Sequence, residues 1–203
     1  LYEWWRRLPP ESFAVLTSPY AGSQDFDRAQ NFLIRRTREP VLLPHPLMAR
    51  RINKMAQEFG AELVVLDPAL PLGLVGPRLD LPYAVVLHGA EVTVPGRLPV
   101  TKQILSRVLN KAEFVIASGG YPADEAKRVA GQIKNLTVIT PGVDIKRFKQ
   151  LTASEKSQAR QIFGISDEAE LVVGVSRLVP RKGFDVLIRA VAHLASDYPK
   201  LRL

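Results

Sequence analysis

Residues 83–91 have the sequence Tyr-Ala-Val-Val-Leu-His-Gly-Ala-Glu, a short apolar run followed at once by an imidazole and a carboxylate. Similar runs, rich in valine, isoleucine and leucine, alternate along the chain with segments of helical period. This alternation is typical of parallel βαβ units. The predicted strands are 13–17, 31–35, 62–66, 83–87, 113–117, 136–140 and 171–175. The sequence therefore predicts an α/β fold built on a parallel sheet.

Five segments between these runs have helical periodicity, at 47–59, 99–112, 122–129, 154–163 and 184–195. In the first of them, Met48, Ile52, Met55 and Phe59 recur at helical spacing, so we expect this stripe to face the sheet.

The third helix is predicted to begin at Pro122, with Asp124 and Glu125 in its first turn, as the helix dipole favours. Carboxylates at that end argue against an anion site. We therefore expect Gly119 and Gly120 to make a tight turn into the helix instead of a phosphate loop.

The chain of 203 residues is 46% hydrophobic, which is enough to bury a core. It has no cysteine, so a disulfide framework and a cysteine-based zinc site are excluded, and its three histidines lie too far apart for a short-spaced metal motif. Neither a membrane-spanning run nor a signal peptide is recognisable. The chain starts inside an apparent amphipathic helix and stops as a strand begins, which we interpret as truncation at both ends.

A net charge of +8 favours anionic partners. The basic residues are scattered and lack interleaved aromatic residues, so nucleic acid is not the expected partner. Arg50, Arg51 and Lys54 form a basic face on the first helix, opposite its apolar stripe. Contact with an anionic membrane surface and simple solvation both remain open for this face.

The composition changes after residue 140, where Pro141, Gly142, Val143 and Asp144 lead into a polar helix and a new βα unit. We therefore expect a domain boundary near Lys149, with one Rossmann-like domain at 1–149 and the incomplete start of a second at 150–203.

Ligands of open parallel sheets bind beyond the carboxyl ends of the strands, so residues that directly follow strands are candidates for a site. His88 and Glu91 follow the strand at 83–87, with Gly89 allowing close approach. A structural hydrogen-bonding role for a single histidine remains the alternative.

The second candidate region is 176–183, which joins the strand at 171–175 to the helix at 184–195. It places Arg177, Arg181 and Lys182 beside a helix N-terminus, where free backbone N–H groups and the dipole favour anions. Cations crowded there repel one another unless a polyanion binds among them. A solvated basic turn is the alternative, and the segment matches neither a Walker loop nor a dinucleotide fingerprint.

Three motifs occur in the order expected for glycosyltransferase family 4, which has the GT-B architecture of two Rossmann-like domains. They are His88-Gly89-x-Glu91, Pro141-Gly142-Val143-Asp144 with Phe148, and Ser176-Arg177-Leu178 followed by Arg181-Lys182-Gly183-Phe184. The chain resembles this family over nearly its whole length. Within the family it is most similar to the actinobacterial mannosyltransferases that use GDP-mannose to extend phosphatidylinositol mannosides. Those relatives often have His-Gly-His-Glu where this chain has alanine at the third position.

The resemblance implies a hexosyltransferase that moves a sugar, expected to be mannose from GDP-mannose, to a hydroxyl of a glycolipid or other glycan, with retained configuration and without a metal. The nucleotide sugar is then a co-substrate and no other cofactor is expected. Arg177 and Lys182 would stabilise the leaving diphosphate, and His88 would lie near the transferred sugar. Ser176, Gly142 and Glu91 would make further donor-loop or cleft contacts.

The family's donor-site glutamates would fall beyond Leu203, and its glycine-rich loop before Leu1. We therefore expect this fragment to be inactive alone and the intact product to be about twice as long. The family likeness also implies a cytoplasmic enzyme, peripheral at the inner face of the plasma membrane.

Two other classes of protein fit the sequence less well. A Rossmann oxidoreductase or a nucleotide-sugar epimerase requires a glycine fingerprint, and Gly119 and Gly120 have the wrong spacing for it. A non-catalytic α/β module that binds polyanions or lipids would explain the charge but not the ordered motifs.

Overall fold

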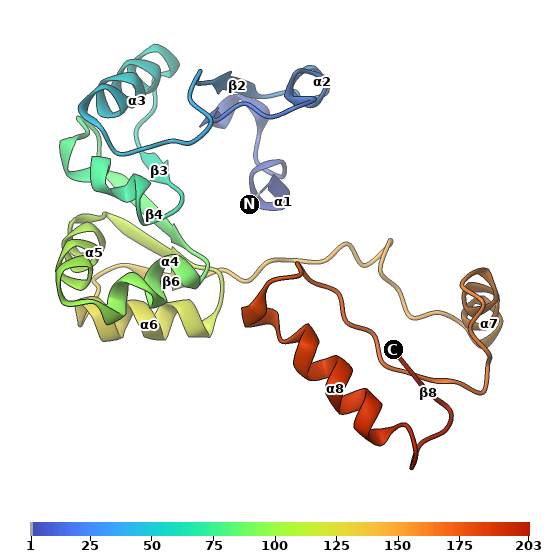
Figure 1. Cartoon of the computed structure of the whole chain (residues 1–203). Coiled ribbons are helices and arrows are strands. Elements are labelled where there is room, and N and C mark those ends of the chain that lie inside the picture. Colours follow the sequence, from blue (N-terminus) through green and yellow to red (C-terminus); the bar gives the residue numbers. More distant parts are fainter. Residues whose placement is uncertain (1) are drawn as a thin grey trace. The chain divides into compact units, whose positions relative to one another are not determined.

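The computed structural model describes residues 2–203, and the chain divides into two compact units, Leu1–Gly142 and Val143–Leu203 (Figure 1). The sequence placed a domain boundary near Lys149. The division between the units precedes that position by a few residues, directly after Gly142.

Two parallel sheets organise the first unit. A two-stranded sheet contains β1 (Ala14–Thr17) and β2 (Leu33–Arg36), and a four-stranded sheet contains β3 (Val64–Leu66), β4 (Tyr83–Leu87), β5 (Phe114–Ala117) and β6 (Leu136–Val138). The second sheet has the strand order β3-β4-β5-β6, and every pair in it is parallel. All six strands overlap predicted strands, so the α/β prediction is confirmed.

Helices connect these strands, as parallel pairing requires. The longer ones are α2 (Ser23–Arg28), α3 (Pro46–Phe59), α5 (Pro99–Lys111) and α6 (Gly120–Ala130). The shorter ones are α1 (Tyr2–Trp5), α4 (Ala90–Thr93) and the 3-10 helices η1 (Pro10–Ser12), η2 (Leu72–Arg78) and η3 (Pro95–Arg97).

Helix α3 has defined signals at both ends. The His45 side chain accepts a hydrogen bond from the backbone N–H of Met48, and Gly60 ends the helix in the left-handed conformation. Met48, Ile52 and Met55 are buried, and the first two join the core cluster of the first unit. The predicted apolar stripe is therefore confirmed at these positions.

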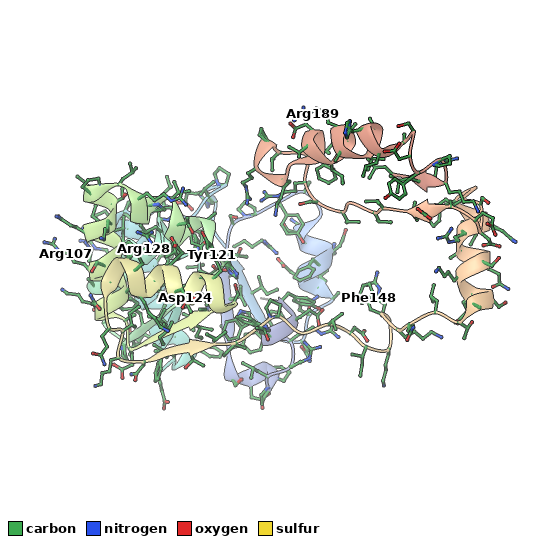
Figure 2. All side chains as sticks on the ribbon, turned by 90° about the horizontal axis from the view of Figure 1, so that it is seen from below. Arg107, Tyr121, Asp124, Arg128, Phe148 and Arg189 are labelled. Atoms are coloured by element: carbon green, nitrogen blue, oxygen red, sulfur yellow. The ribbon has the colours of Figure 1, made fainter. Side chains whose placement is uncertain are left out.

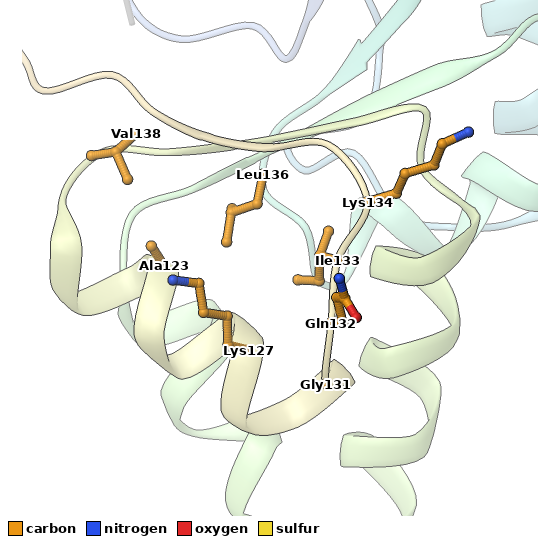
Figure 3. Close-up of a pocket in the computed structure, with 8 residues that line it drawn as sticks. All are labelled: Ala123, Lys127, Gly131, Gln132, Ile133, Lys134, Leu136 and Val138. Atoms are coloured by element: carbon orange, nitrogen blue, oxygen red, sulfur yellow. The ribbon is translucent and has the colours of Figure 1, made fainter.

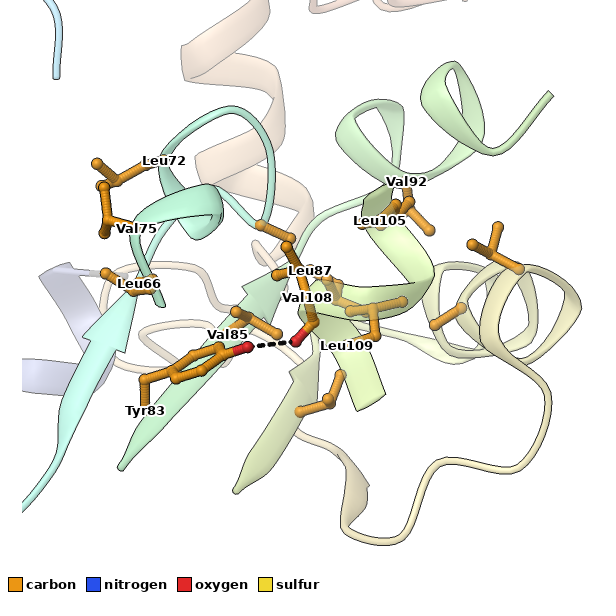
Figure 4. Packing of buried hydrophobic residues seen from close by; sticks show 14 of the residues in the cluster. Leu66, Leu72, Val75, Tyr83, Val85, Leu87, Val92, Leu105, Val108 and Leu109 are labelled. Carbon is orange, nitrogen blue, oxygen red and sulfur yellow. Dashed lines mark hydrogen bonds between the residues drawn. The ribbon is translucent and has the colours of Figure 1, made fainter. Parts of the chain in front are cut away.

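The core of the first unit is centred on β4, whose five residues are all buried. Leu105, Val108 and Leu109 of α5 pack in the same cluster (Figure 4). The Tyr83 hydroxyl donates a hydrogen bond of 2.7 Å to the backbone carbonyl of Val108, which ties the first residue of β4 to α5. Burial raises the pKa of Tyr83 to about 12.

The start of α6 differs from the prediction. The helix begins at Gly120, so Pro122 is its third residue and no acidic residue lies in its first turn. A proline is tolerated throughout a first turn, because none of those N–H groups has an intrahelical acceptor. Asp124 lies further along the exposed surface of α6 (Figure 2). The prediction that carboxylates in the first turn of this helix oppose an anion site is therefore wrong.

The second unit contains α7 (Ala153–Ile162), β7 (Glu170–Leu171), η4 (Pro180–Lys182), α8 (Phe184–Leu194) and β8 (Leu201–Arg202). A capping box between Thr152 and Glu155 begins α7. Strand β7 shares only Leu171 with the predicted strand at 171–175, so the strand prediction for residues 172–175 is wrong. Its partner β8 pairs with β7 over two residues only. The apolar side chains of this unit are largely exposed, Val175 to 91%.

No helix within residues 2–203 combines the length and the apolar composition that a membrane crossing requires.

Candidate active site

His88 directly follows β4, and its imidazole Nε2 lies 3.1 Å from the Asp67 carboxylate oxygen Oδ1. Asp67 directly follows β3, the neighbouring strand, in which Leu66 pairs with Val85. The His88 side chain is 42% exposed, and the Asp67 side chain is 29% exposed. Two adjacent strand ends thus bring a carboxylate and an imidazole together at an accessible edge of the sheet.

Asp67 was not among the site residues predicted from the sequence, although the signal was present. The same rule that selected His88, a polar residue directly after a predicted strand, also selects Asp67 after the strand at 62–66. Burial raises the pKa of the Asp67 carboxyl; the nearby charge of Glu91 also raises it, whereas the contact with His88 opposes the shift. Asp67 is therefore harder to ionise than a fully solvated aspartate.

The Glu91 side chain folds back onto the turn that carries His88. Its Oε1 accepts a hydrogen bond of 2.9 Å from the Gly89 N–H and another from the His88 N–H. Gly89 has φ 141° and ψ −71°, a conformation that side-chain-bearing residues avoid. Glu91 thus fixes the backbone of the His88 turn.

Two hydroxyl groups lie on the segments that follow β4 and β5. Thr93 Oγ1 on α4 is 3.0 Å from the hydroxyl of Tyr121, near the start of α6. Tyr121 is 59% exposed. The strand-end edge of the first unit therefore offers carboxylate, imidazole and hydroxyl groups, the set that binds polyhydroxylated ligands by hydrogen bonds.

Ser176, Arg177 and Lys182 are exposed in the second unit, in the turn that contains η4 and leads into α8. Lys182 directly precedes Gly183, which has φ 67° and precedes the first residue of α8. Within residues 2–203, Arg177, Arg181 and Lys182 form no ion pair. These cations thus remain available to an anion beside a helix N-terminus.

Two further features define this helix end. A Cβ atom on Gly174 would lie 3.0 Å from the Phe184 ring and 3.1 Å from the Leu187 side chain, so the glycine allows the preceding segment to pack closely on α8. Asp185 is the acidic residue of the first turn, and its carboxylate forms an ion pair of 2.7 Å with Arg189.

Gly142, the last residue of the first unit, is exposed and has open space where a side chain would be. His88 and Glu91 belong to the first unit, and Ser176, Arg177 and Lys182 belong to the second.

A pocket of about 390 Å³ lies between α6 and β6 (Figure 3). Lys127 extends toward Ala123, whereas Lys134 points away from Ile133 and Leu136. None of the predicted site residues lines this pocket. No group of three histidine, aspartate or glutamate side chains within residues 2–203 is arranged to hold a metal ion.

No family model matches the chain. It is 33% identical over 196 residues to the GDP-mannose-dependent alpha-(1-6)-phosphatidylinositol monomannoside mannosyltransferase of Mycolicibacterium smegmatis, covering 93% of this chain and 50% of that protein. It is 28% identical over 200 residues to the corresponding monoacylated-substrate enzyme of Corynebacterium glutamicum, covering 96% of this chain and 52% of that protein. The chain thus spans about half the length of these curated relatives.

Solved structures resemble the chain in fold. Anabaena HepE in complex with UDP superposes with a TM-score of 0.66 at 21% identity, over 84% of this chain and 47% of HepE. A glycosyltransferase from Rickettsia africae superposes with a TM-score of 0.67 at 15% identity, over 89% of this chain and 49% of that protein. The chain is therefore similar in sequence to phosphatidylinositol monomannoside mannosyltransferases over about half of their length, and it has the GT-B glycosyltransferase fold.

Proposed function

We propose that this chain is the acceptor-side domain and the opening of the donor-side domain of a retaining glycosyltransferase. Its donor is GDP-mannose, and its acceptor is a hydroxyl of a glycolipid or other glycan. The proposal is supported by the mannosyltransferases that resemble the chain over more than nine-tenths of its length and by the fold that it shares with HepE.

The observation that carries the chemistry is the cationic turn at the start of α8. When a glycosidic bond to a nucleotide diphosphate breaks, negative charge accumulates on the departing diphosphate. Arg177 and Lys182, together with the N–H groups of the first turn of α8, stabilise that charge in the role that Mg²⁺ fills in other enzymes. Ser176 and Gly142 make further contacts with the donor.

His88 orients the transferred sugar and the acceptor and supports the oxocarbenium-like transition state. The turn that carries it is fixed by Glu91, which binds the two backbone N–H groups described above. Glu91 thus contributes to the site by positioning the turn.

The basic face of α3 supplies the membrane contact in this proposal. Arg50 is exposed, whereas Arg51 pairs with Glu39 at 2.8 Å and Lys54 lies 3.8 Å from Glu58. Leu47, one turn before Arg51, is also exposed. A cationic and apolar surface of this kind suits anionic headgroups, so the enzyme acts in the cytoplasm at the inner face of the plasma membrane.

The test is a turnover assay on the product of the complete gene, with GDP-mannose and UDP-sugars compared as donors. A charge-assisted hydrogen bond contributes about 1.5–3 kcal/mol, and about 1.4 kcal/mol is tenfold in rate, so Lys182→Ala should lower kcat roughly ten- to a hundredfold. The matched control is Lys156→Ala on α7, an exposed lysine of the same unit, which should leave kcat unchanged. Equal turnover of Lys182→Ala and the parent enzyme would refute the diphosphate site.

The same preparation tests the non-catalytic alternative and the stereochemistry. A lipid-binding module would sediment with anionic liposomes, independently of nucleotide sugar, and would show no turnover with any donor. The one-bond coupling between C1 and H1 of the transferred sugar distinguishes retention from inversion, because the H1–H2 coupling of mannose is small in both anomers.

A further inference from the structure

The contact between His88 and Asp67 specifies which imidazole nitrogen carries the proton. An ionised carboxylate only accepts hydrogen bonds, and Oδ1 of Asp67 lies 3.1 Å from Nε2 of His88. A neutral imidazole that satisfies this contact is protonated at Nε2 and has its lone pair on Nδ1.

We propose that Asp67 is a positioning residue that fixes His88 as the Nε2–H tautomer, so that Nδ1 is presented to the substrates as a hydrogen-bond acceptor. Nδ1 accepts a hydrogen bond from a hydroxyl group of the acceptor substrate or of the transferred sugar. This last step rests on the proposed function, whereas the tautomer assignment rests on the geometry alone.

Both ends of the pair are held by rigid structure. Asp67 and His88 leave adjacent strands whose pairing register is fixed by the main chain, and β4 is buried throughout. Glu91 holds the backbone of the His88 turn from the other side. The imidazole of His88 therefore has a hydrogen-bond partner at Nε2, and its backbone is held in place. In this arrangement the carboxylate of Asp67 orients the histidine.

Nuclear magnetic resonance of imidazole ¹⁵N nuclei measures this tautomer directly in the histidine-labelled product of the complete gene, at a pH where imidazoles are neutral. Substitution of single histidines by glutamine assigns the signals. His45 is the internal reference for a fixed Nε2–H tautomer, because its Nδ1 accepts a hydrogen bond of 3.2 Å from the Met48 N–H. His193 is exposed and serves as the solvated reference.

We expect the wild-type spectrum of His88 to match that of His45, with a tautomer ratio at least about tenfold higher than that of His193, from the strength of a charge-assisted bond. In Asp67→Asn, the neutral amide is a weaker acceptor and can donate to Nε2, so the ratio should fall about tenfold or more. Asp80→Asn, at an exposed aspartate of the same unit, should change nothing.

Kinetics supply the second readout. Asp67→Asn should lower kcat about ten- to a hundredfold, because a His88 side chain in mixed tautomers orients the acceptor and the transferred sugar less well. A wild-type His88 with the tautomer mixture of His193 overturns the proposal, even if Asp67→Asn does not fold. If His88 shows the expected tautomer but the enzyme transfers sugar to no acceptor, the proposed function is overturned, whereas the assignment of Asp67 as the residue that fixes the tautomer stands.

Discussion

Gly89→Ala isolates backbone strain at the turn that carries His88. Gly89 has φ 141°, yet no atom lies within 4 Å of the position that an added Cβ would occupy. The substitution therefore causes no steric overlap with neighbours, and its whole cost arises from a conformation that alanine disfavours.

The expected cost is about 1–3 kcal/mol, the usual range for a residue forced into a sparsely populated region. For a chain of this size, each kcal/mol shifts the midpoint of thermal unfolding by about 2–4 °C, so Gly89→Ala should lower it by about 2–12 °C. If the turn relaxes instead, the Glu91 hydrogen bonds to the N–H groups of His88 and Gly89 must lengthen.

Gly120→Ala is the matched control. An added Cβ there also meets no atom within 4 Å, but Gly120 lies at the start of α6 and has no positive φ. Alanine should stabilise the protein by about 0.4–1 kcal/mol, because it restricts the unfolded chain without straining the folded one. Thermal unfolding followed by circular dichroism measures both variants. Equal changes of the same sign would refute the assignment of strain to Gly89.

Two further stability predictions concern buried and exposed hydrogen bonds. Tyr83→Phe should lower the free energy of unfolding by about 1–3 kcal/mol at neutral pH, because the buried Val108 carbonyl loses its side-chain donor. Urea denaturation measures this change. Tyr198→Phe, at an exposed tyrosine, is the control and should leave the stability unchanged. The hydrogen bond from Arg51 lowers the pKa of Glu39 from 4.5 to about 2, so the ionised form stabilises the fold above pH 4.5 and this contribution is lost as the pH falls toward 2. Glu39→Gln should therefore be less stable than wild type at pH 7 and equal to it near pH 2, and a difference in unfolding midpoint that does not change with pH would contradict the assignment.

Much of the first unit could be predicted because its signals are local. The apolar stripe of α3 and the continuous apolar run of β4 determine their own burial, and the position of His88 after β4 follows from the strand itself. The α6 start was misplaced because proline is compatible with several first-turn positions, so it does not fix the first residue.

Other features depend on contacts between segments that are distant in the sequence. The pairing of Asp67 with His88 requires that β3 lie beside β4, and the return of the Glu91 side chain to the His88 turn requires the backbone conformation of Gly89. The short β7 depends on the extent of its partner β8. Periodicity contains no information about such pairings, so these features emerge only from the three-dimensional arrangement.

The origin of Asp67 and His88 on adjacent strands has a consequence for how sequences of this type can diversify. The segment 68–82 connects the two strands, but main-chain pairing of β3 with β4 determines how far apart their ends lie. Leu72 and Val75 of this connection belong to the core, whereas Pro71, Pro77 and Arg78 are exposed. Substitutions at the exposed positions can therefore accumulate while the pair keeps its spacing. Lineages can in this way explore new surface contacts beside an unchanged imidazole, and protein engineers can vary the same exposed positions for the same purpose.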